Sequence, residues 1–334
     1  MKRILIIQTA FIGDAVLAAA MLEKVHLSHP DWKIDFLVRK GNEGLFAEHP
    51  FLNRLIIWDK KENKYLHLLQ LLFKIRSKKY DIVVNAQRYA ATGFLTGFSG
   101  AREKIGFDKN PLSFLFSNKV KHDTLVEGTY LHEVERNQRL IASFTDGQYA
   151  MPRLYPSAAD EKEVKVLKGK PYICVAPASV WKTKQYPKFK WREFLDAISE
   201  DYVVYLIGAP SDKELCERIS SKSSHKMIFN LAGKLSFLQS AALMKDAKMN
   251  YANDSAPMHF ASAMNAPITA VYCSTVPEFG YGPLGKNSTI IEADIKLSCK
   301  PCGTHGSNRC PEKHYDCAIK IKKEQLLATL PSII

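Results

Sequence analysis

A single carboxylate, Asp14, stands between an aliphatic run and a helical pattern near the start of the chain. The aliphatic run, residues 4–7, is typical of a buried parallel strand, and residues 15–24 favour a helix. Ligands of open α/β sheets bind beyond the carboxyl ends of the strands, where Asp14 would lie. Asp14 is therefore either a functional carboxylate at this edge or a cap of the helix N-terminus.

A second polar group, residues 253–259, reads Asn-Asp-Ser-Ala-Pro-Met-His. Small capping residues before Pro257 predict the start of a helix, whose free amides and positive dipole end bind anions. His259 follows in the first turns, either as a phosphate donor or as a structural histidine. Ser179 and Lys184 come after another predicted strand and offer hydroxyl and ammonium donors. Two such loops in one domain suggest a diphosphate site.

Repeated strand and helix patterns surround both groups, and such repeats predict parallel sheets. The proline-containing stretch 151–157 suits a linker, and 334 residues exceed what one core usually serves. We expect two Rossmann-like α/β domains, 1–155 and 156–320, with a helix in 321–334 packing back on the N-terminal domain. The predicted strands are 4–7, 34–38, 55–58, 81–85, 172–175, 202–207 and 268–272; helices are expected within 15–29, 66–76, 191–199, 212–221 and 237–245.

The first turn lacks the fingerprint of a dinucleotide site. Such a turn needs several glycines to admit a pyrophosphate, whereas Gly13 stands beside the bulky Phe11 and Ile12. The sequence also has no G-x-x-x-x-G-K-[ST] phosphate loop and no G-x-S-x-G serine elbow. These absences argue against an NAD-dependent enzyme and a serine hydrolase.

The chain is basic, with 47 Lys and Arg against 34 Asp and Glu and a formal charge of +13. This charge favours an anionic partner, but no zinc-finger or RNA-binding signature points to nucleic acid. Residues 60–79 form an apolar helical pattern with basic ends, which is either a packed helix with solvated lysines or a segment that lies on an anionic membrane. Without a long apolar run or signal segment, we expect a cytoplasmic protein.

Five short motifs, taken together and in this order, resemble the lipopolysaccharide heptosyltransferases, the ADP-heptose-using enzymes of glycosyltransferase family 9. The motifs lie at residues 13–15, 183–187, 206–208, 230–234 and 253–259. The resemblance covers nearly the whole chain. It implies a GT-B fold with an acceptor domain and a nucleotide-sugar domain across a cleft, no cofactor, and metal-independent transfer with inversion. It also implies that Asp14 is the catalytic base.

We therefore expect heptose transfer from ADP-heptose to the inner core of lipopolysaccharide, with the enzyme peripheral on the cytoplasmic face of the inner membrane. An inverting transfer needs a base and an electrostatic sink for the leaving diphosphate. The expected donor-binding residues are Ser179, Lys184, Asp254, Ser255, Ala256 and His259, with Asp254 orienting the loop or the sugar. The expected acceptor-binding residues are Arg39, Lys40, Lys60, Lys61 and Arg88, with Arg102 and Lys104 nearby in the same basic group.

The sequence departs from the family pattern at two places. Ala256 stands where the family usually has glycine, and Gln185-Tyr186 stands where it tends to have Arg-Trp or His-Trp. Two alternatives therefore stay open: a transferase or epimerase that uses another nucleotide sugar on the same fold, and a catalytically silent nucleotide-sugar binder.

The seven cysteines fall into two sets. Cys174, Cys216 and Cys273 lie in or beside predicted core elements and are expected to be reduced and buried. The others, Cys299, Cys302, Cys310 and Cys317, cluster near His305 and His314. This second set has enough ligands for a structural zinc, but its spacing is not that of a zinc ribbon, so metal binding, disulfides and free thiols all remain open.

Overall fold

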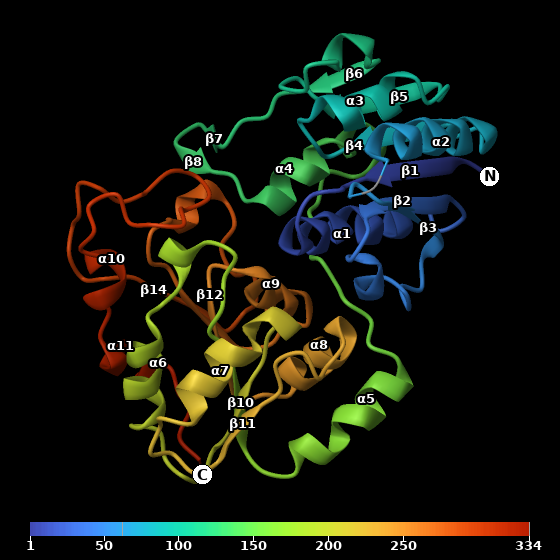
Figure 1. Ribbon diagram of the computed structural model, residues 1–334. Coiled ribbons are helices and arrows are strands. Elements are labelled where there is room, and N and C mark those ends of the chain that lie inside the picture. Colours follow the sequence, from blue (N-terminus) through green and yellow to red (C-terminus); the bar gives the residue numbers. More distant parts are fainter. Residues whose placement is uncertain (62, 334) are drawn as a thin grey trace. The chain divides into compact units, whose positions relative to one another are not determined.

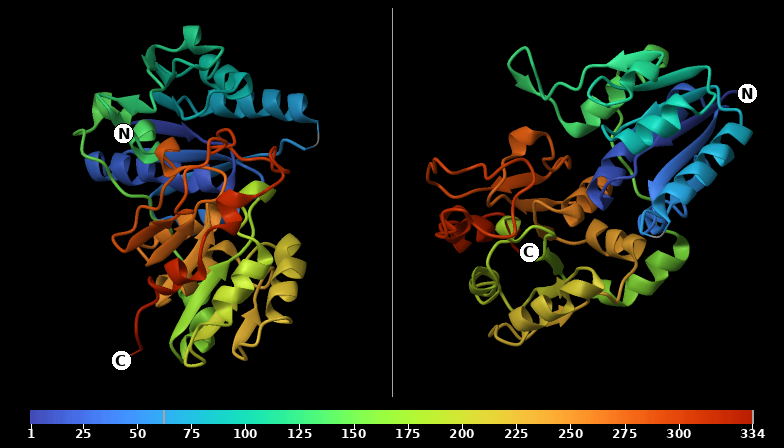
Figure 2. Two further views of the ribbon diagram at one scale, coloured as in Figure 1. Left: turned by 90° about the vertical axis from the view of Figure 1, so that its left-hand side faces the viewer. Right: turned by 45° about the horizontal axis from the view of Figure 1, so that its top comes forward.

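The computed structural model describes residues 1–61 and 63–333. The chain divides into two compact units, Met1–Tyr155 and Pro156–Ile334. Each unit contains a six-stranded sheet with helices packed against it (Figure 1, Figure 2).

The first sheet has the strand order β3-β2-β1-β4-β5-β6, and all its neighbouring strands are parallel. Its strands are β1 Arg3–Ile7, β2 Lys33–Arg39, β3 Leu52–Trp58, β4 Ile82–Asn85, β5 Glu103–Phe107 and β6 Asn118–Val120. The central strand β1 pairs with β2 through Ile4 and Ile34, and with β4 through Ile4 and Ile82. Residues 4–7 are fully buried, which explains why this strand reads as a continuous aliphatic run.

Helices cover both faces of the first sheet, with α1 and α2 on opposite sides of it (Figure 1). The helices of this unit are α1 Ile12–Ser28, α2 Lys64–Ser77, α3 Ala90–Gly97 and α4 Glu133–Arg139; a hairpin of β7 Leu125–Val126 and β8 Thr129–Tyr130 precedes α4. In α2, Leu68, Leu71, Leu72 and Ile75 repeat at helical spacing and enter the same core cluster as Leu5. α1 packs against α4 and buries nearly all of its length.

The second sheet repeats the same plan, in the order β11-β10-β9-β12-β13-β14 and again with parallel neighbours. Its strands are β9 Tyr172–Ala176, β10 Val203–Leu206, β11 Ile228–Asn230, β12 Met249–Asn253, β13 Ile268–Val271 and β14 Ser288–Ile291. Counted within each unit, both sheets follow the order 3-2-1-4-5-6 of Rossmann folds. The predicted α/β class with two Rossmann-like parallel-sheet domains is confirmed.

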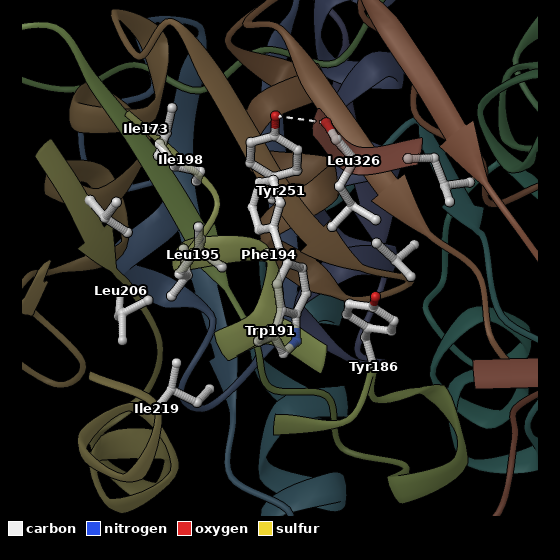
Figure 3. Packing of buried hydrophobic residues seen from close by; sticks show 14 of the residues in the cluster. Ile173, Tyr186, Trp191, Phe194, Leu195, Ile198, Leu206, Ile219, Tyr251 and Leu326 are labelled. Carbon is white, nitrogen blue, oxygen red and sulfur yellow. Dashed lines mark hydrogen bonds between the residues drawn. The ribbon is translucent and has the colours of Figure 1, made fainter. Parts of the chain in front are cut away.

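Several of the largest buried side chains of the second unit pack together in one core cluster (Figure 3). The helices of this unit are α5 Ala158–Val164, α6 Lys188–Leu195, α7 Lys213–Ser220, α8 Phe237–Lys245, α9 Ala256–Ala263, α10 Asp316–Ile319 and α11 Lys323–Leu327. On α6, Trp191 and Phe194 are fully buried, and the Phe194 ring centroid lies 4.7 Å from that of Tyr251. The Tyr251 hydroxyl donates to the carbonyl of Leu326, 3.2 Å away.

The C-terminal helix α11 contacts α6 in the second unit, and its Leu326 is fully buried in the core of that unit. The Leu326 side chain of this helix therefore packs within the second unit, residues 156–334. A return of residues 321–334 to the N-terminal domain stays a prediction.

The predicted strands are all present, whereas seven strands of the part of the chain described escaped prediction: β5, β6, β7, β8, β11, β12 and β14. β5 reads EKIGF and β12 reads MNYAN, so polar residues interrupt the aliphatic pattern of both. In β12, Asn250 and Asn253 are fully buried, and their side-chain amides donate to backbone carbonyls, which offsets the cost of burying them. Over the part of the chain described, no helix combines the length and the apolar character that crossing a bilayer requires.

The core of the second unit gives a stability prediction. Phe194→Ala should lower the free energy of unfolding by about 3–5 kcal/mol, because it leaves a cavity where a buried ring packed. Phe189 lies on the same helix with 41% of its surface exposed, so Phe189→Ala should cost less than about 1 kcal/mol. Urea denaturation of the full chain, followed by tryptophan fluorescence, measures both. Equal losses from the two variants would contradict the packing described.

Candidate active site

Asp14 lies in the first turn of α1, just beyond the carboxyl end of β1. The N-cap of this helix is Phe11, three residues earlier, and the Phe11 side chain makes no capping hydrogen bond. The interpretation of Asp14 as the N-cap is therefore wrong. Its half-buried carboxylate lies instead at the positive end of a 17-residue helix dipole, which favours a negative charge there.

Hydrogen bonds from neighbouring strand ends hold the loop that leads to Asp14. The Lys60 ammonium donates to the carbonyl of Thr9 at 2.6 Å, and the Asn42 side-chain amide donates to the carbonyl of Ala10 at 3.2 Å. The Thr9 hydroxyl donates to Oε1 of Gln87 at 2.6 Å. The loop is thus tied to the ends of β2, β3 and β4.

Lys60, predicted to bind the acceptor, is half-buried in this network. Burial lowers the pKa of its ammonium to about 8, with the charges of Arg39 and Lys64 adding to the effect. Its Nζ also lies 4.6 Å from the centre of the Trp58 ring. Lys60 therefore supports the loop of Asp14 in addition to bringing positive charge to this edge.

The other predicted acceptor residues follow the same strand ends. Arg39 ends β2 and lies 5.5 Å from the ring of Phe11. Lys40 forms a 2.7 Å ion pair with Asp59. Lys61 and Arg88 are exposed in the segments after β3 and β4. All four lie at the carboxyl edge of the sheet, as does the loop of Asp14.

Arg102 and Lys104 do not belong to this group. Arg102 precedes β5 and Lys104 is the second residue of that strand. In a parallel sheet the amino ends of the strands lie at the edge opposite to their carboxyl ends. The expectation that these two residues join the acceptor group is therefore wrong.

A cationic cluster around His122, after β6, was missed by the sequence analysis. Burial, followed by the charges of Arg88, Arg136 and Lys109, lowers the pKa of the His122 imidazole to about 4. The Lys109 ammonium donates to the carbonyl of His122 at 3.0 Å. The polar triplet 108–110, directly after β5, could have indicated this cluster from the sequence, but β5 itself was not predicted. Arg136 pairs with Glu133 at 2.7 Å, so Arg88 and Lys109 are the two cations that this cluster adds to the carboxyl edge of the first sheet.

In the second unit, the buried side chain of Asn253 ties together the loops at the carboxyl edge. Its Nδ2 donates to the carbonyl of Pro177 at 2.8 Å, and its Oδ1 accepts from the backbone N–H of Tyr186 at 2.9 Å. These bonds join the end of β12 to the loops after β9. The predicted loops around Ser179 and Asp254 thus meet at one place.

Asp254 is the next residue, and its carboxylate is almost fully buried. Its Oδ2 pairs with the Lys184 ammonium at 2.6 Å and accepts from the hydroxyl of Thr275 at 2.6 Å. A buried ion pair of this kind needs further hydrogen bonds to offset desolvation, and Thr275 supplies one. The structure thus fixes the position of Lys184 through Asp254.

Helix α9 begins directly after these residues, with Ser255 as its N-cap and Pro257 in its first turn. The Ser255 hydroxyl does not cap the helix; it donates to the carbonyl of Asn253 at 3.3 Å. Ala256 is the first helical residue and has no positive φ, so alanine fits where the family usually has glycine. His259 follows in the second turn, and only 5% of its surface is exposed.

The second departure from the family pattern also has a structural account. The Gln185 side chain donates to the carbonyl of Ser179 at 2.7 Å and so closes the loop after β9. Tyr186 is buried, and its ring lies edge-on to Trp191 with 5.1 Å between the centroids. Tyr186 is therefore part of the core of the second unit.

All seven cysteines are free thiols. Cys174, Cys216 and Cys273 are buried, as predicted, and burial raises the pKa of each thiol. In the second set, Sγ of Cys299 lies 3.7 Å from Nε2 of His314, and Cys310 and Cys317 are buried. Across residues 1–61 and 63–333, no three His, Cys, Asp or Glu side chains are placed to hold a metal ion.

Known proteins resemble this chain in sequence and in fold. Lipopolysaccharide heptosyltransferase 1 of Pseudomonas aeruginosa is 24% identical over 97% of this chain and 93% of its own. The crystal structure of a family 9 glycosyltransferase from Veillonella parvula superposes with a TM-score of 0.86 at 22% identity, over 98% of this chain and 96% of that one. E. coli ADP-heptose lps heptosyltransferase II gives a TM-score of 0.79 at 22% identity, over 99% and 97%.

The family model described as Glycosyltransferase family 9 (heptosyltransferase) matches residues 68–315, well over half of the chain. This range includes the Asn253 network and the start of α9. The same fold and whole-length relatives accompany the match. The chain therefore belongs to glycosyltransferase family 9, the heptosyltransferases.

Proposed function

We propose that this glycosyltransferase moves heptose from ADP-heptose to the inner core of lipopolysaccharide, with inversion and without a metal ion. The observation that carries the proposal is that each sheet has one polar edge at the point where its strand order reverses. One edge presents Asp14, and the other presents Lys184 beside the start of α9. The similar E. coli structure carries ADP-heptose and lps in its name, ADP-heptose lps heptosyltransferase II, and this supports the proposed donor and acceptor.

The second unit would bind the nucleotide diphosphate. Lys184 brings a positive charge whose position Asp254 fixes, and the backbone amides at Ser255 and Ala256 lie at the positive end of α9. Ser179 and His259 border the same loops and are the further donor residues. Charge on the departing diphosphate increases in the transition state, so these groups stabilise that state more than the ground state.

The first unit would bind the acceptor and remove its proton. Asp14 takes the proton of the acceptor hydroxyl while the oxygen attacks the anomeric carbon of the heptose. The bond between that carbon and the diphosphate oxygen breaks on the opposite face, and its electron pair leaves with ADP. One displacement of this kind inverts the configuration at the anomeric carbon.

The positive charges at the carboxyl edge of the first sheet favour an anionic acceptor. Arg39, Lys40, Lys61 and Arg88 lie at the same edge as Asp14, and Arg88 belongs to the cluster around His122. Guanidinium groups bind carboxylates and phosphates in a bidentate fashion. The inner core of lipopolysaccharide carries such groups, so this edge fits the proposed acceptor.

The assignment of the base is tested by Asp14→Asn, which keeps the size of the side chain but removes its basicity. Transfer from ADP-heptose to acceptor should fall by about 10²–10⁴-fold, while binding of ADP stays unchanged. Asp31 is exposed just after α1, so Asp31→Asn is the matched control and should keep normal transfer. A folded Asp14→Asn enzyme with near-normal transfer would show that another group is the base.

The donor site is tested by Lys184→Met. Loss of this ammonium should weaken ADP binding by about 10–100-fold, the worth of one charged hydrogen bond, in a calorimetric titration. Lys182 is exposed in the same 3-10 helix, and Lys182→Met should change the affinity less than about twofold.

Lys184→Met also leaves Asp254 buried without its ion pair, which destabilises the loop. The double variant Lys184→Met/Asp254→Asn removes that charge and separates the two effects. ADP binding restored in the double variant would mean that Lys184 has no direct role toward the diphosphate.

A further inference from the structure

Helix α2 has a second apolar surface besides the one that packs into the core. Tyr65, Leu66, Leu69 and Phe73 are 76%, 54%, 45% and 68% exposed, and we name these four residues the α2 stripe. At helical spacing they fall within an arc of about 100°. The stripe runs over two turns of the helix. Large apolar side chains in such a row are a marker of an interaction surface.

The buried side of the same helix shows that the stripe is not needed for folding. Leu68, Leu71, Leu72 and Ile75 lie in the core cluster of the first unit and hold α2 against the sheet. The exposed ring of Phe98, next to α3, adjoins the end of α2, since its carbonyl accepts from Arg76 at 2.8 Å. The apolar surface therefore extends from the stripe toward Phe98.

The charges around the stripe are almost all positive. Residues 60–79 contain seven Lys and Arg and one Glu: Lys60, Lys61, Lys64, Lys74, Arg76, Lys78, Lys79 and Glu62. Among the residues that the structure describes, no ion pair engages Lys64, Lys74 or Arg76. The Lys64 ammonium lies 5.8 Å from the centre of the Tyr65 ring, at the start of the stripe.

We propose that the α2 stripe docks the protein on an anionic lipid bilayer. An interfacial helix lies in the plane of the membrane, with aromatic and aliphatic side chains among the acyl chains and lysines at the phosphate level. The stripe and its flanking lysines have this arrangement. A second copy of the chain fits poorly, because it would place two strongly basic helices face to face. This goes beyond the proposed transfer reaction and holds whichever sugar is transferred.

Vesicle co-sedimentation at low salt tests the proposal. The wild-type chain should bind phosphatidylglycerol-containing vesicles and bind neutral phosphatidylcholine vesicles far more weakly. Leu69→Ser/Phe73→Ser should weaken binding at least about tenfold, since two large apolar groups no longer enter the bilayer. Val166 and Phe229 are exposed in the second unit, so Val166→Ser/Phe229→Ser is the matched control and should bind normally.

A charge series completes the test. Lys64→Glu/Lys74→Glu should also weaken binding at least about tenfold, whereas Lys165→Glu/Lys222→Glu, with the same net charge at exposed positions, should not. The thermal transition reports folding and should stay unchanged in every variant. Transfer to a lipid-free acceptor reports activity and should stay unchanged in Leu69→Ser/Phe73→Ser, whose residues lie outside the proposed site. Unchanged vesicle binding in the stripe variants would overturn the proposal. The proposal would also be overturned if the wild-type chain formed a dimer and Leu69→Ser/Phe73→Ser dissociated that dimer without any effect on vesicle binding.

Discussion

The reversal of strand order beside the first strand of each sheet is the constraint on which the rest of the structure depends. In the first unit the chain crosses from β3 back past β1 to β4, and in the second from β11 back past β9 to β12. In open α/β sheets, the loops after the two strands at such a reversal leave the sheet in opposite directions, and ligands bind there. Asp14 follows β1 and Asn253 ends β12, so both polar groups arise at such a reversal.

Side-chain amides fix the loops at these edges. Asn42 and Gln87 hold the loop after β1, and Asn253 joins the end of β12 to the loop after β9. These amides bond to backbone groups and to the Thr9 hydroxyl without bringing a charge, so they leave the local field to the lysines and helix ends. That division suits a site whose groups must stabilise negative charge without rearranging during the reaction.

The fold was predictable where strands are buried on both faces, because such strands become continuous aliphatic runs. It was not predictable at β12, whose buried asparagines gain their partners only from distant loops. The candidate site follows the same rule. Residues 253–259 were identified because a helix start has a local signature, whereas the pairing of Lys184 with Asp254 and the cations around His122 depend on the tertiary fold. Asp14 was placed correctly at a strand end, but its exact position in the first turn required the structure.

The most direct test of the account is nucleotide-sugar consumption by the purified full chain, with and without lipopolysaccharide inner core as acceptor. ADP-heptose, GDP-sugars and UDP-sugars are supplied in separate reactions, and the sugar products are analysed by mass spectrometry. The account predicts that only ADP-heptose is consumed, only when acceptor is present, and with one heptose added to the acceptor. Conversion of a donor without acceptor, or equal use of nucleotides other than adenine, would contradict it.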